Sequence, residues 1–309
     1  MLKTILFDNT HNEMMNFEDS EFSEFLNLLH RLGTNVKKNE NERLKQEMLR
    51  KVDLLIIGNP IDDLFSSIEI KIIVDYVRSG GGLLLLSEYG SDYLQKTNIN
   101  DISGKFGISF EKNIIKEINT TNQNCTSILH IQDFVKHPLT KNVREIKIGG
   151  ACSLILSKEA NPLLYTIENS WPEIFNNSTE EWVKEGEEMT KVIAAYSEFG
   201  RGKVVAIGDI DIFTTASNIG LNSVDNKKLI QNIITWLTEP IKEPRVISFL
   251  LNQIGELHFE IRETNKVINN LIETITILEK RISYLEENTQ LYPNQTPLEN
   301  SSKEESLQE

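Results

Sequence analysis

The stretch that decides the fold runs from Asp53 to Ser87 and reads DLLIIGNPIDDLFSSIEIKIIVDYVRSGGGLLLLS. Its first and last apolar runs, Leu54–Ile57 and Leu83–Leu86, are short and continuous, which is typical of strands buried on both faces. Between them, Ser66 and Glu69 have the spacing of a capping box, and a helix is predicted from there to the Ser-Gly-Gly-Gly stop. A strand, a capped helix and a second strand in this order indicate a parallel βαβ unit.

The same alternation continues on both sides of this unit. Apolar strands are predicted at Thr4–Phe7, Val192–Glu198 and Lys203–Gly208, with amphipathic helices around Phe25 and from Asn226 to Leu237. Helices between buried strands predict an α/β domain of the flavodoxin-like, doubly wound type with a mostly parallel sheet. In such domains, ligands bind where the carboxyl ends of the strands meet the loops.

The middle of the chain, from about Phe110 to Glu188, is less regular. Short strands are predicted within residues 127–131, 145–148, 153–156 and 163–167. The part from Trp171 to Glu188 is expected to be an exposed, acidic excursion. Trp171 and Trp182 within it either anchor a partner or a sugar, or cover the edge of the sheet.

A heptad repeat begins after Pro244 and continues for six heptads without drift. Isoleucine occupies every a position and leucine five of the six d positions, a pattern that favours a parallel, two-stranded coiled coil. The a positions are Ile247, Ile254, Ile261, Ile268, Ile275 and Ile282, and the d positions are Leu250, Leu257, Thr264, Leu271, Leu278 and Leu285.

Two features leave the number of helices in this coil open. Thr264 is a polar break at d, while Val267 and Ile272 broaden the apolar face and allow a third helix. The alternative is a single amphipathic helix lying on the domain, but such helices have a wider apolar face with a period nearer 3.6. The expected domains are therefore residues 1–240 (α/β), 245–287 (parallel coiled coil) and 288–309 (disordered acidic tail).

Composition excludes several classes of protein. A net charge of −14 without a basic stripe argues against binding to nucleic acid. The apolar stretch at the N-terminus is too short for a signal peptide or a membrane span. Cys125 and Cys152 alone make a disulfide framework unexpected and favour small core or loop roles. These features predict a cytoplasmic protein without a membrane span.

Three segments together resemble a known family. They are Ile5 to Glu13, Asp53 to Ser87, and Gly200 to Leu237, the last containing GDIDIF at 208–213. They look like the class I glutamine-amidotransferase-like superfamily. More narrowly, they resemble its non-catalytic branch, found in the N-terminal (GIFT-type) domain of the intraflagellar-transport 52-kilodalton subunit and in related prokaryotic proteins of unknown function. The resemblance covers about residues 2–240.

The resemblance implies the fold but argues against glutaminase activity. True amidotransferases of this superfamily carry a Cys nucleophile on a strand-to-helix turn, with His and Glu supplied from late in the domain. Here the turn reads Ser-Glu-Tyr-Gly-Ser at 87–91, and Asp209 and Asp211 occur late in the domain without a His. A covalent mechanism needs both a nucleophile and its base, so no catalytic residue is assigned.

Polar residues after the first strand, after the strand ending at Leu86 and after the strand ending near Gly208 are the candidates for a ligand site. His11 and Glu13 have side chains able to hold a metal or a polar ligand, but one histidine without a second ligand cluster predicts no metal and no cofactor. The ligand-binding candidates are Asp8, Asn9, His11, Glu13, Ser87, Glu88, Asp209 and Asp211.

Some of these candidates also have a purely structural interpretation. Asp8 and Asn9 can satisfy loop amides, and Asp209 can cap the segment that follows it. Asp225 and Asn226 can cap the last helix of the domain in the same way.

The sequence thus predicts a non-enzymatic interaction or scaffold protein. Its α/β domain would bind a protein partner or small ligand, and its coiled coil would form a parallel homodimer, with a trimer left open. The alternative is a hydrolase or a carbohydrate sensor that uses a rim formed by Asp8, His11, Glu88 and Asp209.

Overall fold

The computed structural model describes residues 2–118, 124–241 and 243–290. The chain divides into two compact units, residues 1–247 and residues 248–309. The first is a mixed α/β structure with a large sheet, and the second is dominated by a long helix.

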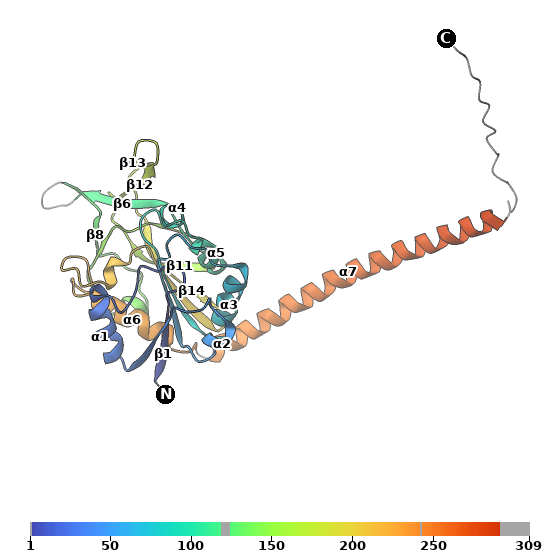
Figure 1. The fold of residues 1–309 in the computed structure, drawn as a ribbon, viewed down its shortest axis with the longest axis horizontal. Helices are drawn as coiled ribbons and strands as arrows, with labels where there is room; N and C mark the ends of the chain where they lie inside the picture. Colours follow the sequence, from blue (N-terminus) through green and yellow to red (C-terminus); the bar gives the residue numbers. More distant parts are fainter. Residues whose placement is uncertain (1, 119–123, 242, 291–309) are drawn as a thin grey trace, which may run out of the picture. The chain divides into compact units, whose positions relative to one another are not determined.

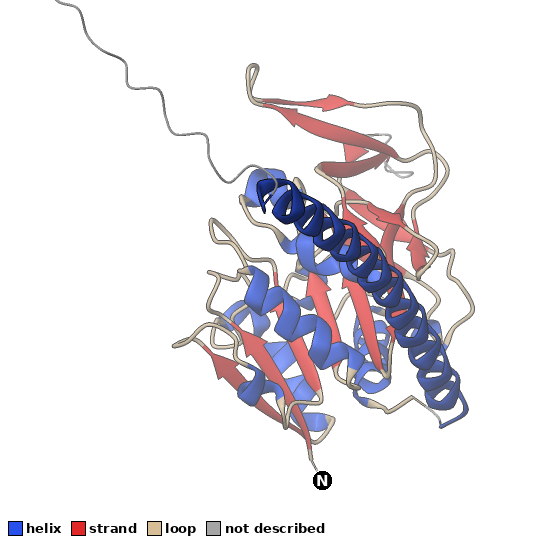
Figure 2. Ribbon diagram, turned by 90° about the vertical axis from the view of Figure 1, so that its right-hand side faces the viewer, coloured by secondary structure: helices blue, strands red, loops and turns tan. Residues whose placement is uncertain are grey.

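A nine-stranded sheet forms the centre of the first unit (Figures 1 and 2). Its order is β2-β1-β3-β4-β15-β14-β10-β5, with β11 also paired to β14. The five strands from β2 to β15 are mutually parallel, and the remaining pairs are antiparallel. Their bounds are β1 Lys3–Asp8, β2 Thr34–Asn39, β3 Leu54–Gly58, β4 Gly82–Leu86, β5 Ile108–Phe110, β10 Leu154–Leu156, β11 Ala160–Tyr165, β14 Val192–Phe199 and β15 Gly202–Ile207.

The parallel sheet predicted from the sequence is confirmed only for these five strands. The other pairs are antiparallel, so the sheet is mixed, and β14 is antiparallel to β15 because a tight turn at Gly200 and Arg201 joins them. A connection of that length permits only an antiparallel pair, since parallel neighbours need a crossover of a dozen or more residues.

Helices cover both faces of the sheet (Figure 1). The α-helices of this unit are α1 Ser23–Arg31, α2 Gln46–Leu49, α3 Ser67–Arg78, α4 Ser91–Gln95, α5 Ile99–Ser103 and α6 Asn226–Thr238. Buried side chains of α1 and α6 pack on one face of the sheet, whereas those of α2, α3 and α5 pack on the other. Short 3-10 helices lie at Ser20–Phe22, Gly104–Phe106, Pro138–Thr140 and Asp211–Phe213.

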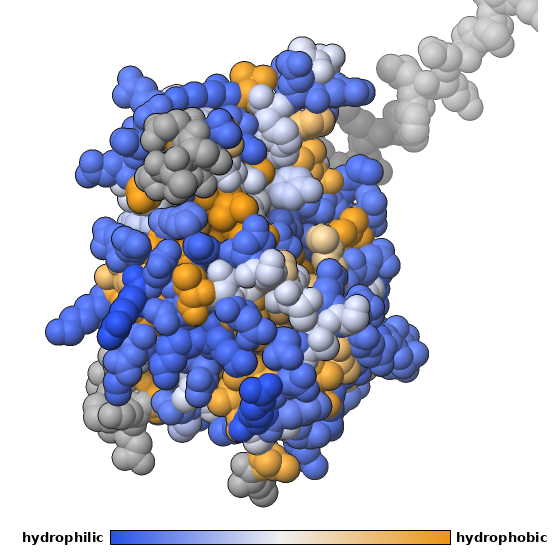
Figure 3. Space-filling model, turned by 90° about the vertical axis from the view of Figure 1, so that its left-hand side faces the viewer, coloured by the Kyte–Doolittle hydropathy of each residue, from blue (hydrophilic) through white to orange (hydrophobic). Residues whose placement is uncertain are grey.

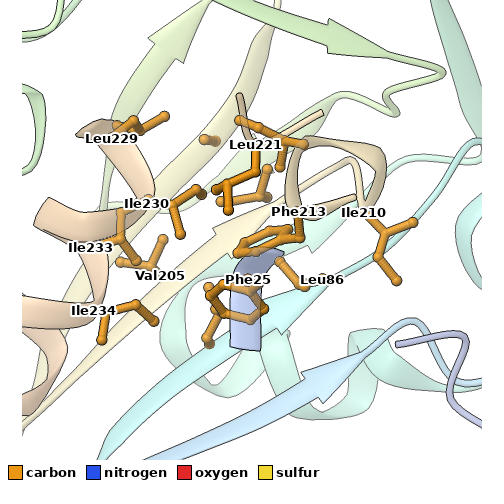
Figure 4. Packing of buried hydrophobic residues seen from close by; sticks show 14 of the residues in the cluster. Phe25, Leu86, Val205, Ile210, Phe213, Leu221, Leu229, Ile230, Ile233 and Ile234 are labelled. Carbon is orange, nitrogen blue, oxygen red and sulfur yellow. The ribbon is translucent and has the colours of Figure 1, made fainter. Parts of the chain in front are cut away.

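Alternate residues of the central strands serve these two layers. In β4, Leu84 and Leu86 belong to the core under α1 and α6, while Leu83 and Leu85 belong to the core under α3 and α5. This two-sided burial explains the continuous apolar runs, because successive side chains of a strand point to opposite faces. Figure 4 shows the first core, where Phe25 of α1 and Phe213 make an edge-to-face contact with ring centroids 4.9 Å apart.

A second, antiparallel sheet has the order β13-β12-β6-β7, and β8 pairs with β9 (Figure 1). The expectation of an exposed excursion from Trp171 to Glu188 is wrong at its start. This segment forms a hairpin that pairs with β6, and only 7% of Trp171 is exposed. Local patterns did not indicate it, because Trp171 becomes buried only by pairing with β6. The bounds are β6 Asn113–Ile118, β7 Cys125–Thr126, β8 Ile128–Ile131, β9 Ile146–Gly149, β12 Trp171–Asn176 and β13 Glu181–Lys184.

Helix α7, Glu243–Gln290, begins in the last residues of the first unit, and its remainder makes up the described part of the second unit. Within the parts of the chain that the structure describes, no helix is both long and apolar enough to cross a membrane. The predicted tail lies outside the described residues from position 291 onward. Figure 3 shows one face of the molecule, on which hydrophilic residues predominate and apolar residues are interspersed, as is usual for protein surfaces.

Candidate functional site

The carboxyl ends of the parallel strands carry buried polar residues. Asp8 ends β1, Asn59 follows β3, Ser87 follows β4 and Asp209 follows β15; each is at most 1% exposed. Burial of a polar group is unfavourable unless it has a partner, so these positions need an explanation. Asp8 and Asp209 each belong to a group of ionisable side chains at this edge of the sheet.

The first group, called the His11 cluster, consists of Asp8, His11, Glu13 and Glu69. The His11 ring is fully buried and stacks on Phe65 with ring centroids 3.7 Å apart. Its Nδ1 lies 3.1 Å from Oδ2 of Asp8 and 3.6 Å from Oε1 of Glu13. The backbone N–H of His11 donates to the other oxygen of Glu13 at 2.9 Å. The short loop after β1 thus folds back on itself around the imidazole.

Glu69 comes to the His11 cluster from the start of α3. One of its oxygens, Oε2, accepts hydrogen bonds from the backbone N–H and hydroxyl of Ser66, which confirms the predicted capping box. The other oxygen, Oε1, lies 3.2 Å from Nε2 of His11. This distance suits an ion pair, but neither atom has a hydrogen-bond partner, so the two are not aligned for a hydrogen bond. Sequence reasoning used Glu69 only as a cap and missed its second role.

Electrostatic effects in this cluster oppose one another. Burial lowers the pKa of His11, but hydrogen bonds to Asp8 and Glu13 and their negative charges outweigh it and raise that pKa to about 9. Burial raises the pKa of Glu13. Asp8 accepts further hydrogen bonds from Asn39 Nδ2 at 2.9 Å and from the Thr10 hydroxyl at 3.1 Å. Its carboxylate therefore binds side chains rather than the loop amides of the structural interpretation.

The second group, called the Glu88 cluster, consists of Glu88, Asp209, Asp211 and Cys152. Oε1 of Glu88 accepts the backbone N–H of Ile210 at 2.8 Å. Burial, followed by the negative charge of Asp209, raises the pKa of Glu88 well above its usual value. Burial and the charge of Asp211 likewise raise the pKa of Asp209. These carboxyl groups are close enough to disfavour simultaneous ionisation.

Asp209 also has the local role expected from the sequence, since its carboxylate accepts the backbone N–H groups of Asp211 and Ile212 at 3.1 and 3.0 Å. Asp225 does not cap α6; its carboxylate accepts the backbone N–H of Arg144 at 2.8 Å instead. The buried side chain of Asn226 donates to the carbonyl of Gly220 at 2.9 Å, which ties the start of α6 to the preceding loop.

The turn after β4 contains two hydroxyl groups. Ser87 Oγ donates to Ser91 Oγ at 3.2 Å, and both residues are 1% exposed. Sequence reasoning missed that Cys152 lies beside this turn. Burial, followed by the negative charge of Glu88, raises the pKa of its thiol, although a hydrogen bond with Ser87 lowers it in part. A nucleophilic cysteine needs the opposite environment, one that favours the thiolate.

The two clusters are separated by a strand. Asp8 lies at the end of β1 and Glu88 after β4, with β3 between these strands. At a strand spacing of about 4.8 Å, the ends of β1 and β4 are about 10 Å apart. The structure therefore brings Asp8, His11 and Glu13 together, and separately Glu88, Asp209 and Asp211. Asn9 lies beside the first group, where its Nδ2 donates to the carbonyl of Met15 at 2.9 Å.

A cavity of about 380 Å³ lies at the opposite, amino end of the parallel strands. Lys3 and Asp53 line it and form an ion pair of 3.0 Å, and Pro240, just before α7, also contributes. No residue of the His11 cluster or of the Glu88 cluster lines this cavity, so it is separate from the polar edge at the carboxyl ends of the strands.

Comparisons with known proteins agree with this arrangement at the level of the fold. Residues 4–120 match the family model of the IFT52 GIFT domain. That segment contains β1, β3 and β4 and all four residues of the His11 cluster. No curated protein matches the chain by sequence.

Solved structures extend the similarity beyond the GIFT segment. The mmIFT52 N-terminal domain is 19% identical with a TM-score of 0.63, and the match covers 76% of this chain and 97% of that one. Two cytoplasmic proteins of Salmonella typhimurium, STM1381 (strain LT2) and STM3548, are 14% and 11% identical, each with a TM-score of 0.51. They are matched over their full lengths by 77% and 78% of this chain. These likenesses show a shared fold.

The apolar residues of the heptad repeat are exposed on α7. Each described a and d side chain of this set is between 46% and 63% exposed; the residues are Ile254, Leu257, Ile261, Ile268, Leu271, Ile275, Leu278, Ile282 and Leu285. The side chains of Ile247 and Leu250 lie outside the described part. A continuous apolar stripe of this length on one helix is unusual for a surface without a partner.

Proposed function

We propose that this chain is a non-enzymatic, cytoplasmic interaction protein of the class I glutamine-amidotransferase-like superfamily. The order β2-β1-β3-β4-β15 of its parallel strands supports a flavodoxin-like core, since this is the strand order 2-1-3-4-5 of that fold. The IFT52 GIFT match supports a role in binding another protein. The proposed domains are residues 1–240, 245–287 and 288–309.

The observation that carries the proposal is the exposed heptad stripe of α7. The partner that covers this stripe is a second copy of the same chain. In a parallel two-stranded coil, each isoleucine at a packs against the isoleucine at a of the other helix, and each leucine at d packs against the leucine at d. Each buried aliphatic side chain contributes roughly 1.5–3 kcal/mol, so a seam of this length can exceed the cost of association. The coil would then present two α/β domains at once and strengthen weak contacts by avidity.

The proposal that the protein is not an enzyme is supported by the lack of the Cys nucleophile of glutaminases in the turn after β4 and of a His late in the domain. The turn after β4 carries Ser87 and Ser91, and the nearby Cys152 thiol is held in its protonated form by burial and by Glu88. The alternative, a hydrolase or carbohydrate sensor with one site, has less support. Asp8 and His11 belong to one cluster, whereas Glu88 and Asp209 belong to the other. The polar edge remains the proposed place for a small ligand or for contact with a protein partner.

If α7 forms a coiled coil, negative charges at its a and d positions should prevent the two helices from associating. The double variant Ile275→Asp, Leu278→Asp places four carboxylates in the core of a dimer and should convert it to a monomer. The mass is measured by light scattering during size-exclusion chromatography. Ile277→Asp is the matched control, because Ile277 is 58% exposed and occupies a c position outside the seam.

Two results would contradict this proposal. One is a wild-type protein that is monomeric at tens of micromolar, and the other is a double variant with the same mass as the wild type. Orientation is tested with Ile275→Cys in a Cys125→Ser background, because only parallel helices place the two a-position thiols opposite each other.

A further inference from the structure

Buried polar atoms that make no hydrogen bond are concentrated at one edge of the sheet. Among the described residues, eight buried side-chain polar atoms lack a hydrogen-bond partner, and five of them lie on the loops after β1 and β3 or at the start of α3. These five are Asn9 Oδ1, His11 Nε2, Glu13 Oε1, Asn59 Oδ1 and Glu69 Oε1. Four of the five are oxygen acceptors, so the edge offers more electron pairs than its own donors satisfy.

We propose that Asp8, His11 and Glu13 bind a divalent transition-metal ion of the Zn²⁺ type. Their nearest ligand atoms all lie within 4.8 Å of one another. Nδ1 of His11 lies 3.1 Å from Asp8 Oδ2 and 3.6 Å from Glu13 Oε1. Bonds of about 2.0–2.2 Å to a tetrahedral ion put neighbouring ligand atoms about 3.3–3.6 Å apart, so small side-chain adjustments suffice.

Glu13 provides the strongest single indication. Its side chain is fully buried, and one oxygen accepts the His11 backbone N–H, while the other lies 3.6 Å from Nδ1 of His11, too far for a well-formed hydrogen bond. A buried carboxylate oxygen that faces an imidazole nitrogen without a well-formed hydrogen bond is suited to act as a metal ligand.

Glu69 is a positioning residue in this proposal. Its Oε1 lies 3.2 Å from Nε2 of His11, on the opposite side of the ring from Asp8. When the metal holds Nδ1, a small rotation lets Nε2–H donate to this oxygen, which fixes the tautomer of the ring. The capping box holds the other oxygen of Glu69, so the carboxylate is oriented before the metal binds.

Charge and donor type point to the same class of ion. Three carboxylates surround one imidazole in a buried space, and a divalent cation offsets more of that negative charge than an imidazolium proton does. One imidazole and two carboxylates suit Zn²⁺, Mn²⁺ or Co²⁺ better than Ca²⁺ or Mg²⁺, which prefer all-oxygen ligands. The sequence predicted no metal because it contains one histidine at this position and no second ligand cluster; the distances among Asp8, His11 and Glu13 come only from the folded loop.

The test uses the full chain without an affinity tag, after treatment with a chelator. Titration calorimetry with ZnCl₂ should give one ion bound per chain, and Co²⁺ should give the strong visible absorption of a tetrahedral site. Glu13→Gln should weaken Zn²⁺ binding by at least about 100-fold, and Glu69→Gln by about 10- to 100-fold. Glu117→Gln, which changes a buried glutamate elsewhere in the domain, is the matched control and should bind as the wild type does.

Circular dichroism establishes that each variant is folded, and if Glu13→Gln does not fold, Glu69→Gln and the Co²⁺ spectrum of the wild type decide the question. The proposal is overturned if the wild type shows no saturable binding of one ion. It is also overturned if the variants of the cluster bind Zn²⁺ as tightly as Glu117→Gln does. A third contrary result is a doubly protonated His11 ring, seen by nitrogen NMR, in the presence of saturating Zn²⁺.

Discussion

At the scale of single residues, burial decides the behaviour of the ionisable groups more than sequence neighbours do. Glu117 on β6 is 3% exposed, and burial raises its pKa to about 7 although a hydrogen bond from the His130 backbone N–H lowers it in part. The unfolded chain has the ordinary value of 4.5. Between these two values the folded protein binds more protons, so the free energy of unfolding falls as pH rises from about 4.5 to about 7 and then levels off.

Glu117→Gln should remove this pH dependence. The variant is neutral at every pH and keeps an oxygen for the His130 N–H, so we expect it to be more stable than the wild type at pH 8 by up to about 3 kcal/mol. Near pH 4.5 the two should be alike. Urea denaturation at both pH values measures the difference, with Glu185→Gln on the exposed surface as the control. A variant that is less stable than the wild type at pH 8 would show that the carboxylate is needed in its charged form.

At the scale of elements, the start of α3 joins secondary structure to the polar edge. Ser66 caps the helix, and Glu69 returns the contact with one oxygen while the other faces His11. The Glu69 side chain therefore takes part both in the N-terminal cap of α3 and in the His11 cluster.

Ser66→Ala should lower the free energy of unfolding by about 1 kcal/mol, because the backbone N–H of Glu69 loses its acceptor. For a unit of this size, that corresponds to a fall in Tm of roughly 2–4 °C. Ser67→Ala, one residue further and exposed at the first helical position, is the control and should be nearly neutral. Equal melting temperatures for Ser66→Ala and the wild type would mean that the capping box adds no stability.

At the scale of the whole molecule, the two units differ in what stabilises them. The first unit has two continuous cores, whereas the described a and d residues of α7 are exposed. Isolated helices are only marginally stable in water, so the stability of α7 should depend on association.

Dilution should therefore unfold α7 while leaving the first unit folded. We expect far-ultraviolet circular dichroism at 222 nm to lose helical signal as the concentration falls through the dissociation constant of the dimer. Tryptophan fluorescence should stay constant, because Trp171 and Trp236 belong to the first unit and are buried. A helical signal that does not change as the dimer dissociates would indicate that α7 is stable as a single helix.

The sequence by itself determined the parallel core, the capped helix α3 and the heptad pattern of α7. These features depend on local periodicity and on contacts between near neighbours, such as Ser66 with Glu69, which can be read along the chain. The strands of the second sheet were harder to predict, because Trp171 becomes buried only by pairing with β6, more than fifty residues earlier. The antiparallel pairing of β14 with β15 follows from the tight turn at Gly200 and Arg201, which can be read along the chain.

Only the tertiary structure decided which polar residues act together. Asp8, His11 and Glu13 are close in sequence, yet Glu69 joins them from α3, and Cys152 joins Glu88 and Asp209 from a third segment. The parallel strands end at one edge, but β3 separates the two clusters, so the single rim expected from the sequence became two. Strand order is fixed by packing across the whole chain, and for that reason it lies beyond what local patterns can predict.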